Sequence, residues 1–235
     1  MLDLAGVMAL IAMKALAPHA LLGDGTGGMD TGNRADCRRG GEGWVEYGYL
    51  GSANGNRATG VEARLDRGYL DTHKGTPTGR EIKPPGYQWA RAYLGHLGGL
   101  KTSSAINACH LLGSDLTGSG TDLRNPASCS RQANTQVRGD GRIGDHMFSY
   151  ESQVKAAVDS GQVIHCSVTP RHSGAYTVPV SFDITAEANI PDGSPGIAFK
   201  QTVPNSVYSP REDWKNLGLV TDSRTGLPVP TGSLP

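Results

Sequence analysis

The chain has 235 residues, enough for one domain of about 150–200 residues with tails or for two small domains. Its 22 Lys and Arg residues equal its 22 Asp and Glu residues in number, which excludes a globally basic protein that binds polyanions through net charge. The 33 glycines and 14 prolines make up a fifth of the chain, and this turn-rich composition argues against a coiled coil or a helical bundle.

Residues 1–28 form a mostly apolar segment that Asp3, Lys14 and Pro18 interrupt. A spanning helix needs about 20 apolar residues with few charges, so we predict no stable membrane span. Signal peptides carry positive charge before the apolar part, whereas Asp3 stands there. An atypical export signal, an amphipathic helix and the remnant of an upstream domain all stay open. Residues 29–43, which follow a glycine-rich run, are interpreted as a linker.

Alternating apolar residues and flanking turn signals predict a series of short strands. They lie at residues 44–49, 59–65, 107–112, 125–130, 162–170 and 177–185. Pro179 predicts an edge position or a bulge in the last of these strands. Residues 75–86 form a predicted loop because they contain three prolines, and residues 87–100 mix aromatic and glycine residues without a clear period.

One helix is predicted at residues 148–160, where Tyr150, Val154, Ala157 and Val158 recur at helical spacing. Ser149 is its predicted N-cap and Gly161 its stop signal. Residues 44–188 are therefore a predicted α+β domain with a mainly antiparallel sheet. Residues 189–235 are rich in Pro, Ser and Gly and form a predicted loosely ordered tail, from which Trp214 docks back.

The segment from residue 106 to 135 concentrates the residues that could carry chemistry. It contains His110 on a predicted strand, a turn, and then Asn125 and Asn134, while Glu151 follows at the start of the helix. Histidine can act as a general base near neutral pH, and amide oxygens suit a Mg²⁺ ion that keeps most of its waters. The same residues also fit a core histidine, turn-forming asparagines and an acidic residue placed by the helix dipole.

Several motifs of this region occur in a characteristic order. They are HLLG at 110–113, GSGTD at 118–122, RN at 124–125, QANT at 132–135, MFSYESQV at 147–154 and the strand at 163–170. In this order they resemble the bacterial DNA/RNA non-specific endonucleases of the ββα-metal (His-Me finger) superfamily. The similarity covers about residues 44–185 and implies a ββα-metal motif, a hairpin carrying His110 followed by a helix.

The resemblance implies a role for each candidate residue. His110 would deprotonate the attacking water, and Asn134 would bind one Mg²⁺ (or Mn²⁺) ion directly. Glu151 would hold a metal-bound water, and Asn125 would orient the histidine or the turn. The implied reaction is hydrolysis of phosphodiester bonds in DNA and RNA, through contacts to phosphate, leaving 5′-phosphate ends.

The sequence departs from the family pattern immediately before the histidine. The family has Arg-Gly there, and the arginine helps to hold the phosphate, whereas this chain has Ala108 and Cys109. Arg124 and Arg131 are the nearest candidates to replace it, and Arg91 is a third. A second echo of the motif makes His96 an alternative base, and the DRGY sequence at 66–69 has tyrosine where related nucleases have the base.

The four cysteines are Cys37, Cys109, Cys129 and Cys166, and no two form a C-x-x-C pair. With a hairpin turn centred near residue 119 or 120, Cys109 and Cys129 lie directly opposite each other, which predicts a disulfide. Cys37 and Cys166 are then the remaining pair. Two disulfides indicate an oxidising compartment and a secreted or extracellular protein, and four buried thiols in a cytoplasmic protein are the alternative.

The sequence thus predicts a metal-dependent, sugar-non-specific endonuclease. Such an enzyme fits either an exported scavenging nuclease or a toxin delivered to competitors, which would need an inhibitor (immunity) protein as partner. Two alternatives stay open: a catalytically weak relative that binds nucleic acid, and a structural or adhesion module whose glycine-rich loops only resemble the motif.

Overall fold

The computed structural model describes residues 43–97, 105–135, 146–189, 194–209 and 213–219. The predicted N-terminal segment 1–28 and nearly all of the predicted linker lie outside these residues. Within the described part of the chain, no helix is both long and apolar enough to cross a membrane.

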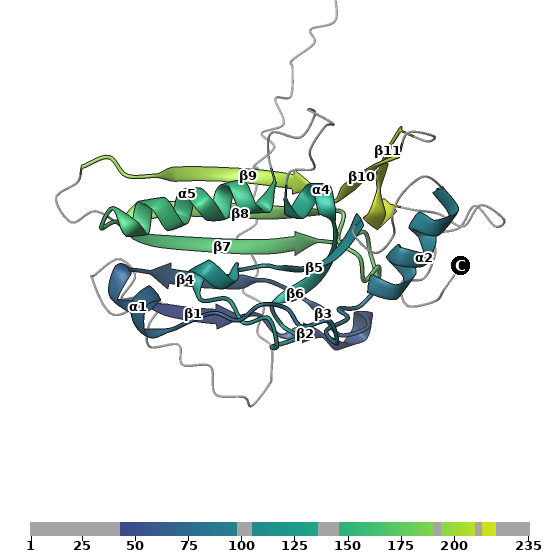
Figure 1. Ribbon diagram of the computed structural model, residues 1–235, viewed down its shortest axis with the longest axis horizontal. Helices are drawn as coiled ribbons and strands as arrows, with labels where there is room; N and C mark the ends of the chain where they lie inside the picture. The colour runs from purple at the N-terminus through teal and green to yellow at the C-terminus, as the bar shows by residue number, and fades with distance from the viewer. Residues whose placement is uncertain (1–42, 98–104, 136–145, 190–193, 210–212, 220–235) are drawn as a thin grey trace, which may run out of the picture. The chain divides into compact units, whose positions relative to one another are not determined.

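A five-stranded antiparallel sheet with the order β1-β4-β7-β8-β9 forms the framework (Figure 1). Its strands are β1 (Trp44–Tyr47), β4 (Val61–Leu65), β7 (Val163–Arg171), β8 (Ser181–Asn189) and β9 (Ala198–Pro204). In β7 the predicted face of Ile164, Cys166 and Val168 is buried, while the residues between them are exposed or half-buried. Such alternation is typical of an antiparallel sheet with one face against the core.

A two-stranded ribbon and two helices cover the apolar face of this sheet. The ribbon is β5 (Ile106–His110) with β6 (Pro126–Ser130), and the helices are α4 (Arg131–Asn134) and α5 (Met147–Asp159). Figure 1 shows α5 running along β7 and β8. The four residues predicted to share one face of the helix are all buried, in one cluster with β4, β7 and β8. The molecule is therefore α+β with a mainly antiparallel sheet, as predicted.

The start of α5 lies earlier than the prediction. His146, not Ser149, is the N-cap: its Nδ1 accepts a hydrogen bond from the Ser149 amide at 3.2 Å, and the Ser149 hydroxyl lies 3.4 Å from the His146 amide. Ser149 thus fills the third helical position of a capping box. Gly161 follows the helix with φ +94°, the left-handed conformation expected of a glycine stop.

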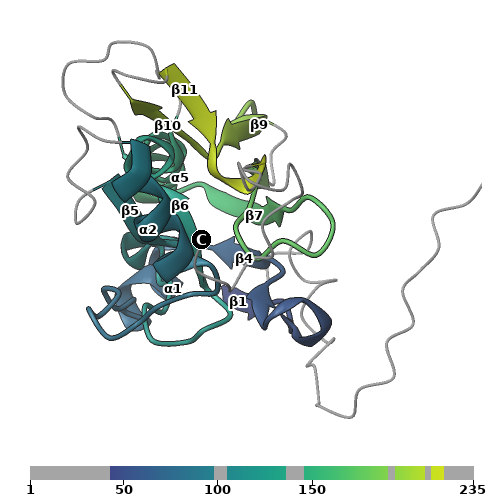
Figure 2. The same cartoon turned by 90° about the vertical axis from the view of Figure 1, so that its right-hand side faces the viewer.

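Residues 87–97, which lack a clear period, form the helix α2 (Tyr87–Leu97). Its buried Trp89, Ala90 and Leu94 pack in a second cluster with Ile106 of β5 and with Val207. Figure 2 shows α2 beside β5 and β6. The helix is therefore held by partners that lie far away in sequence.

The prediction of a loosely ordered tail from residue 189 is wrong for the described residues 194–209 and 213–219. This part of the chain supplies β9 to the main sheet and forms the hairpin of β10 (Ser206–Ser209) and β11 (Asp213–Asn216). The ring centre of Trp214 lies 5.4 Å from that of Tyr208, its partner within this hairpin, so docking of Trp214 onto the rest of the domain stays a prediction. Pro179 precedes β8 and causes no bulge within it.

Short elements complete the chain and connect the larger ones. They are β2 (Leu50–Gly51), β3 (Arg57–Ala58), α1 (Arg67–Thr72) and the 3-10 turns at Ser52–Asn54, Ser114–Leu116 and Leu217–Leu219.

Candidate active site

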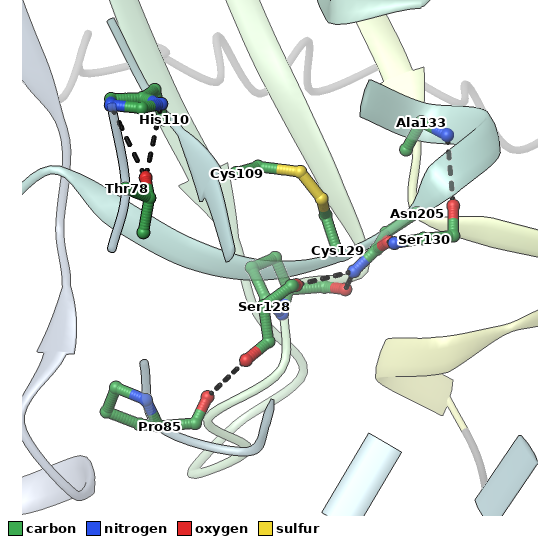
Figure 3. The surroundings of a disulfide bond; sticks show 10 residues. Thr78, Pro85, Cys109, His110, Ser128, Cys129, Ser130, Ala133 and Asn205 are labelled. Carbon is green, nitrogen blue, oxygen red and sulfur yellow. Dashed lines mark hydrogen bonds between the residues drawn. A yellow bond between two sulfur atoms is a disulfide. The ribbon is translucent and has the colours of Figure 1, made fainter. Parts of the chain in front are cut away.

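His110 stands at the end of β5 and is fixed by the loop that follows α1. Its Nε2 lies 2.9 Å from the carbonyl oxygen of Thr76. Because a carbonyl only accepts hydrogen bonds, Nε2 carries the proton and the neutral ring keeps its lone pair on Nδ1. The hydroxyl of Thr78 lies 3.4 Å from both ring nitrogens (Figure 3). Burial lowers the pKa of His110, against the raising effect of Thr76, so the ring is neutral at physiological pH.

A cleft of about 390 Å³ brings three predicted site residues together: His110, Asn134 and Glu151. Its wall also includes Asp115 and, at one end, the ion pair of Lys155 and Asp159. The three site residues come from β5, α4 and α5, so the cleft exists only where the ribbon meets the helices.

Glu151 lies under the turn that follows His110 and hydrogen-bonds to the backbone of Gly113. Burial, reinforced by the nearby charge of Asp115, raises the pKa of Glu151 to about 7. A Cβ atom on Gly113 would lie only 2.7 Å from Glu151 Oε2. A side chain at this position would therefore have to displace the carboxylate.

Asn134 is positioned by a network that reaches the C-terminal strands. It is the last residue of α4, whose N-cap Ser130 accepts a hydrogen bond from the Ala133 amide at 3.0 Å. The Ser130 amide in turn donates to Oδ1 of buried Asn205 at 2.8 Å, and Asn205 Nδ2 donates to the Ser128 carbonyl at 3.1 Å (Figure 3). Asn205 is not among the residues predicted from sequence because it falls in the segment interpreted as a tail.

Asn125 does not line the cleft but shapes the loop beside it. Its buried side chain accepts from the Leu112 amide at 2.9 Å and donates to the carbonyls of Leu112 (3.0 Å) and Ser119 (2.9 Å). Of the two roles expected for Asn125, the geometry fits the one that orients the turn.

Two of the three arginines predicted to replace the missing one, Arg124 and Arg131, have other contacts or positions. Arg124 is exposed, pairs with Asp122 at 2.6 Å and lies over the ring of Tyr47, and Arg131 is exposed at the start of α4. Neither lines the cleft. The nearby sequence echoes also have other roles: DRGY begins α1, with Asp66 accepting from the Tyr69 amide at 2.8 Å, and His96 is in α2.

Cys109 and Cys129 form the predicted disulfide beside His110, with a Cα–Cα distance of 5.9 Å (Figure 3). The predicted register is wrong by two residues: Cys129 lies opposite Asn107, and Cys109 opposite Ala127, so the bridge is diagonal. Cys166 is buried and forms no disulfide with another described cysteine. Cys37 lies outside the described residues, so the Cys37–Cys166 pair stays a prediction.

The donors of the cleft suit a hard divalent cation. The nearby charge of Asp115 adds to the effect of burial in raising the pKa of Glu151, and a cation bound there would offset the cost of charging this carboxylate. The amide oxygen of Asn134 adds a neutral hard donor on the same wall. No cluster of three His, Cys, Asp or Glu ligands occurs among the described residues, but Mg²⁺ commonly uses only one or two protein ligands.

The architecture, with a two-stranded ribbon and a helix packed on an antiparallel sheet, is also that of known nucleases. NucA from Streptococcus agalactiae without metal matches with a TM-score of 0.55 and 19% identity, over 77% of this chain and 81% of that one. The magnesium-bound form of the same protein matches with a TM-score of 0.53 and 18% identity, over 75% of this chain and 81% of that one. Sda1 nuclease with bound zinc matches with a TM-score of 0.55 and 15% identity, over 76% of this chain and 81% of that one. At these identities the likeness establishes a shared fold. Neither a family model nor a curated protein matches the chain.

Proposed function

We propose that this protein is a metal-dependent endonuclease that hydrolyses phosphodiester bonds of DNA and RNA. The observation that carries the proposal is the meeting of a neutral, oriented histidine with Asn134 and Glu151 in one cleft. The fold shared with two nucleases, one structure holding magnesium and another zinc, supports the same activity.

In this mechanism Nδ1 of His110 accepts the proton of the attacking water, while the Thr76 carbonyl holds the ring and stabilises the imidazolium that forms. Asn134 and Glu151 would hold the cation, Asn134 directly and Glu151 through a bound water. When bound, Mg²⁺ or Mn²⁺ would offset the charge on the phosphate and the leaving oxygen. The O3′–P bond breaks, which leaves a 5′-phosphate and a 3′-hydroxyl.

The disulfide beside the base suits an oxidising compartment, so we assign the enzyme to the outside of the producing cell. Both an exported scavenger and a delivered toxin fit this assignment. As a toxin it would require a cognate inhibitor protein, whose binding would have to cover the cleft.

Digestion of plasmid DNA and total RNA with Mg²⁺ or EDTA tests the proposal. We expect metal-dependent cleavage of both, lowered about 10²–10⁴-fold in His110→Ala, because general-base catalysis contributes that much. His165→Ala, an exposed histidine of β7, is the matched control and should cleave like the wild type. Full activity in His110→Ala would move the base elsewhere. Salt-dependent binding without cleavage by the folded wild type would favour a binding protein instead.

A further inference from the structure

A second cleft, of about 570 Å³, lies between the loop at residues 78–83, the start of α2 and strand β5. Three cationic side chains line it, Arg80, Lys83 and Arg91, and no carboxylate does among the described residues. We refer to this cleft as the basic groove. It is unusual in a chain of zero net charge because it collects three cations in one place.

Two of these cations are held in place by one aromatic ring. Lys83 Nζ lies 5.0 Å and Arg91 Cζ 5.8 Å from the ring centre of buried Tyr87. Cation–π contacts order the side chains without neutralising their charge. None of the three cations forms a salt bridge within the described part of the chain, and Glu81, the carboxylate residue of the loop, lies against Gly79 and pairs with none of them.

The basic groove sits on rigid elements. Tyr87 and Arg91 belong to α2, whose apolar face packs on Ile106 of β5. The loop before α2 is tied to β6, because the Ser128 hydroxyl donates to the Pro85 carbonyl at 2.9 Å (Figure 3). Lys83 and Arg91 are therefore held on an ordered framework before any ligand binds, which lowers the cost of binding.

The basic groove leads directly to the candidate base. Ala108, which lines it, and His110 are two residues apart on β5, so both lie on one face of the strand, about 6.6 Å from each other. Thr78 lines the basic groove and also contacts the His110 ring at 3.4 Å. Positive charge on one side of His110 thus faces the acidic cleft with Asp115 and Glu151 on the other.

We propose that the basic groove binds the phosphodiester backbone of the substrate strand, next to the phosphate that is hydrolysed. Lys83 and Arg91, assisted by Arg80, would supply the positive charge that no arginine at position 108 provides. This inference rests on the proposed nuclease function and adds the path of the strand to it. Contacts to phosphate alone position a strand without reading its sequence, so the groove serves DNA and RNA equally.

Binding of short fluorescent single-stranded DNA and RNA, in EDTA and on a His110→Ala background, tests the groove without cleavage. The variant Lys83→Gln/Arg91→Gln removes two charges of the groove. Arg171→Gln/Lys200→Gln removes two charges from the exposed face of the sheet as a matched control. We expect the groove variant to bind at least about tenfold more weakly and its salt slope to fall by about 1.4, that is 0.7 for each lost contact.

With His110 restored, the groove variant should show a raised KM and a nearly unchanged kcat, and adding Ala108→Arg should recover part of the loss. Binding by the groove variant equal to that of the control pair would overturn the inference, even when the wild type cleaves. If the wild type binds nucleic acid but does not cleave it, and the groove variant binds more weakly, only the nuclease function would be overturned. Should the double variant unfold in a thermal melt, the exposed Arg80→Gln takes its place, with an expected slope change of about 0.7.

Discussion

Glu151 couples the site to pH. Its pKa of about 7 in the folded state, against 4.5 ordinarily, means that the folded chain keeps a proton that the unfolded chain has lost. Between those values the free energy of unfolding must therefore fall as pH rises, and the stabilisation present at low pH is gone above about pH 7. We expect wild type in EDTA to lose about 2–3 kcal/mol between pH 4.5 and 8, and Glu151→Gln to lose far less.

Urea denaturation of both proteins at several pH values measures this difference. A wild type whose pH dependence equals that of Glu151→Gln would show that the carboxyl titrates normally. Added Mg²⁺ should shift the loss of stability to lower pH in the wild type alone, because a cation favours the charged carboxylate.

The contact between Gly113 and Glu151 can be tested by substitution without introducing backbone strain. Its φ of −59° is open to any residue, so the only obstacle to alanine is the Glu151 carboxylate 2.7 Å from the new Cβ. We expect Gly113→Ala to displace that carboxylate and lower kcat/KM for a plasmid substrate about 10–100-fold, in the range known for residues that orient metal ligands.

Gly95→Ala is the control, because nothing lies within 4 Å of its Cβ position on the exposed side of α2. It should keep full activity and gain up to about 1 kcal/mol of stability. If Gly113→Ala were as active as the wild type, the position of the Glu151 carboxylate would not matter for catalysis.

At the scale of elements, the disulfide joins β5 to β6 at a diagonal position and closes a loop of 20 residues. Its removal in Cys109→Ser/Cys129→Ser should lower the free energy of unfolding by about 3 kcal/mol. We expect reductant to lower the denaturation midpoint of the wild type in the same way and to leave the double variant unchanged. A midpoint insensitive to both changes would mean that the paired strands hold the ribbon without the bond.

The brace between Asn205 and α4 predicts a long-range effect on metal binding. Asn205→Ala leaves the buried Ser130 amide and Ser128 carbonyl without their partner, each at a cost of about 1–3 kcal/mol. Because α4 ends in Asn134, we expect Mn²⁺ to bind more weakly as well, by isothermal titration of folded protein. Asn216→Ala, which removes a bond donated to the Val180 carbonyl and one accepted from the Gly218 amide, is the control and should keep metal affinity. If Asn205→Ala bound Mn²⁺ as tightly as the wild type, the hydrogen bonds of Asn205 would contribute to stability but not to metal binding.

At the scale of the whole molecule, the elements that sequence could predict are those whose pattern is local. Strands with one buried face and the helix α5 show clear hydrophobic periods. The ordered motifs around them predicted one site with His110, Asn134 and Glu151, and all three line the same cleft. β9 shows no alternation because it is an edge strand with Val203 as its buried residue. Its place depends on pairing with β8, which a local pattern does not encode.

Two further differences between the predicted and the observed structure also arise from contacts between segments that are distant in sequence. α2 is stabilised by packing on Val207 and Leu217 rather than by its own periodicity. The register of β5 and β6 follows from the loop that Asn125 ties together, not from a tight turn at the GSGTD sequence. The basic groove likewise combines residues of a loop, a helix and a strand, and Arg91 alone of its three cations was a candidate from sequence.

The position of Asn205 in the chain has a consequence for biosynthesis. A ribosome adds residues in order, so His110, Asn134 and Glu151 are all made before Asn205 is. Until then Ser130 lacks the partner that fixes α4, and the sheet lacks β9. A nascent chain therefore carries every group of the cleft without their final arrangement, and the cleft is completed only after synthesis has passed the C-terminal strands.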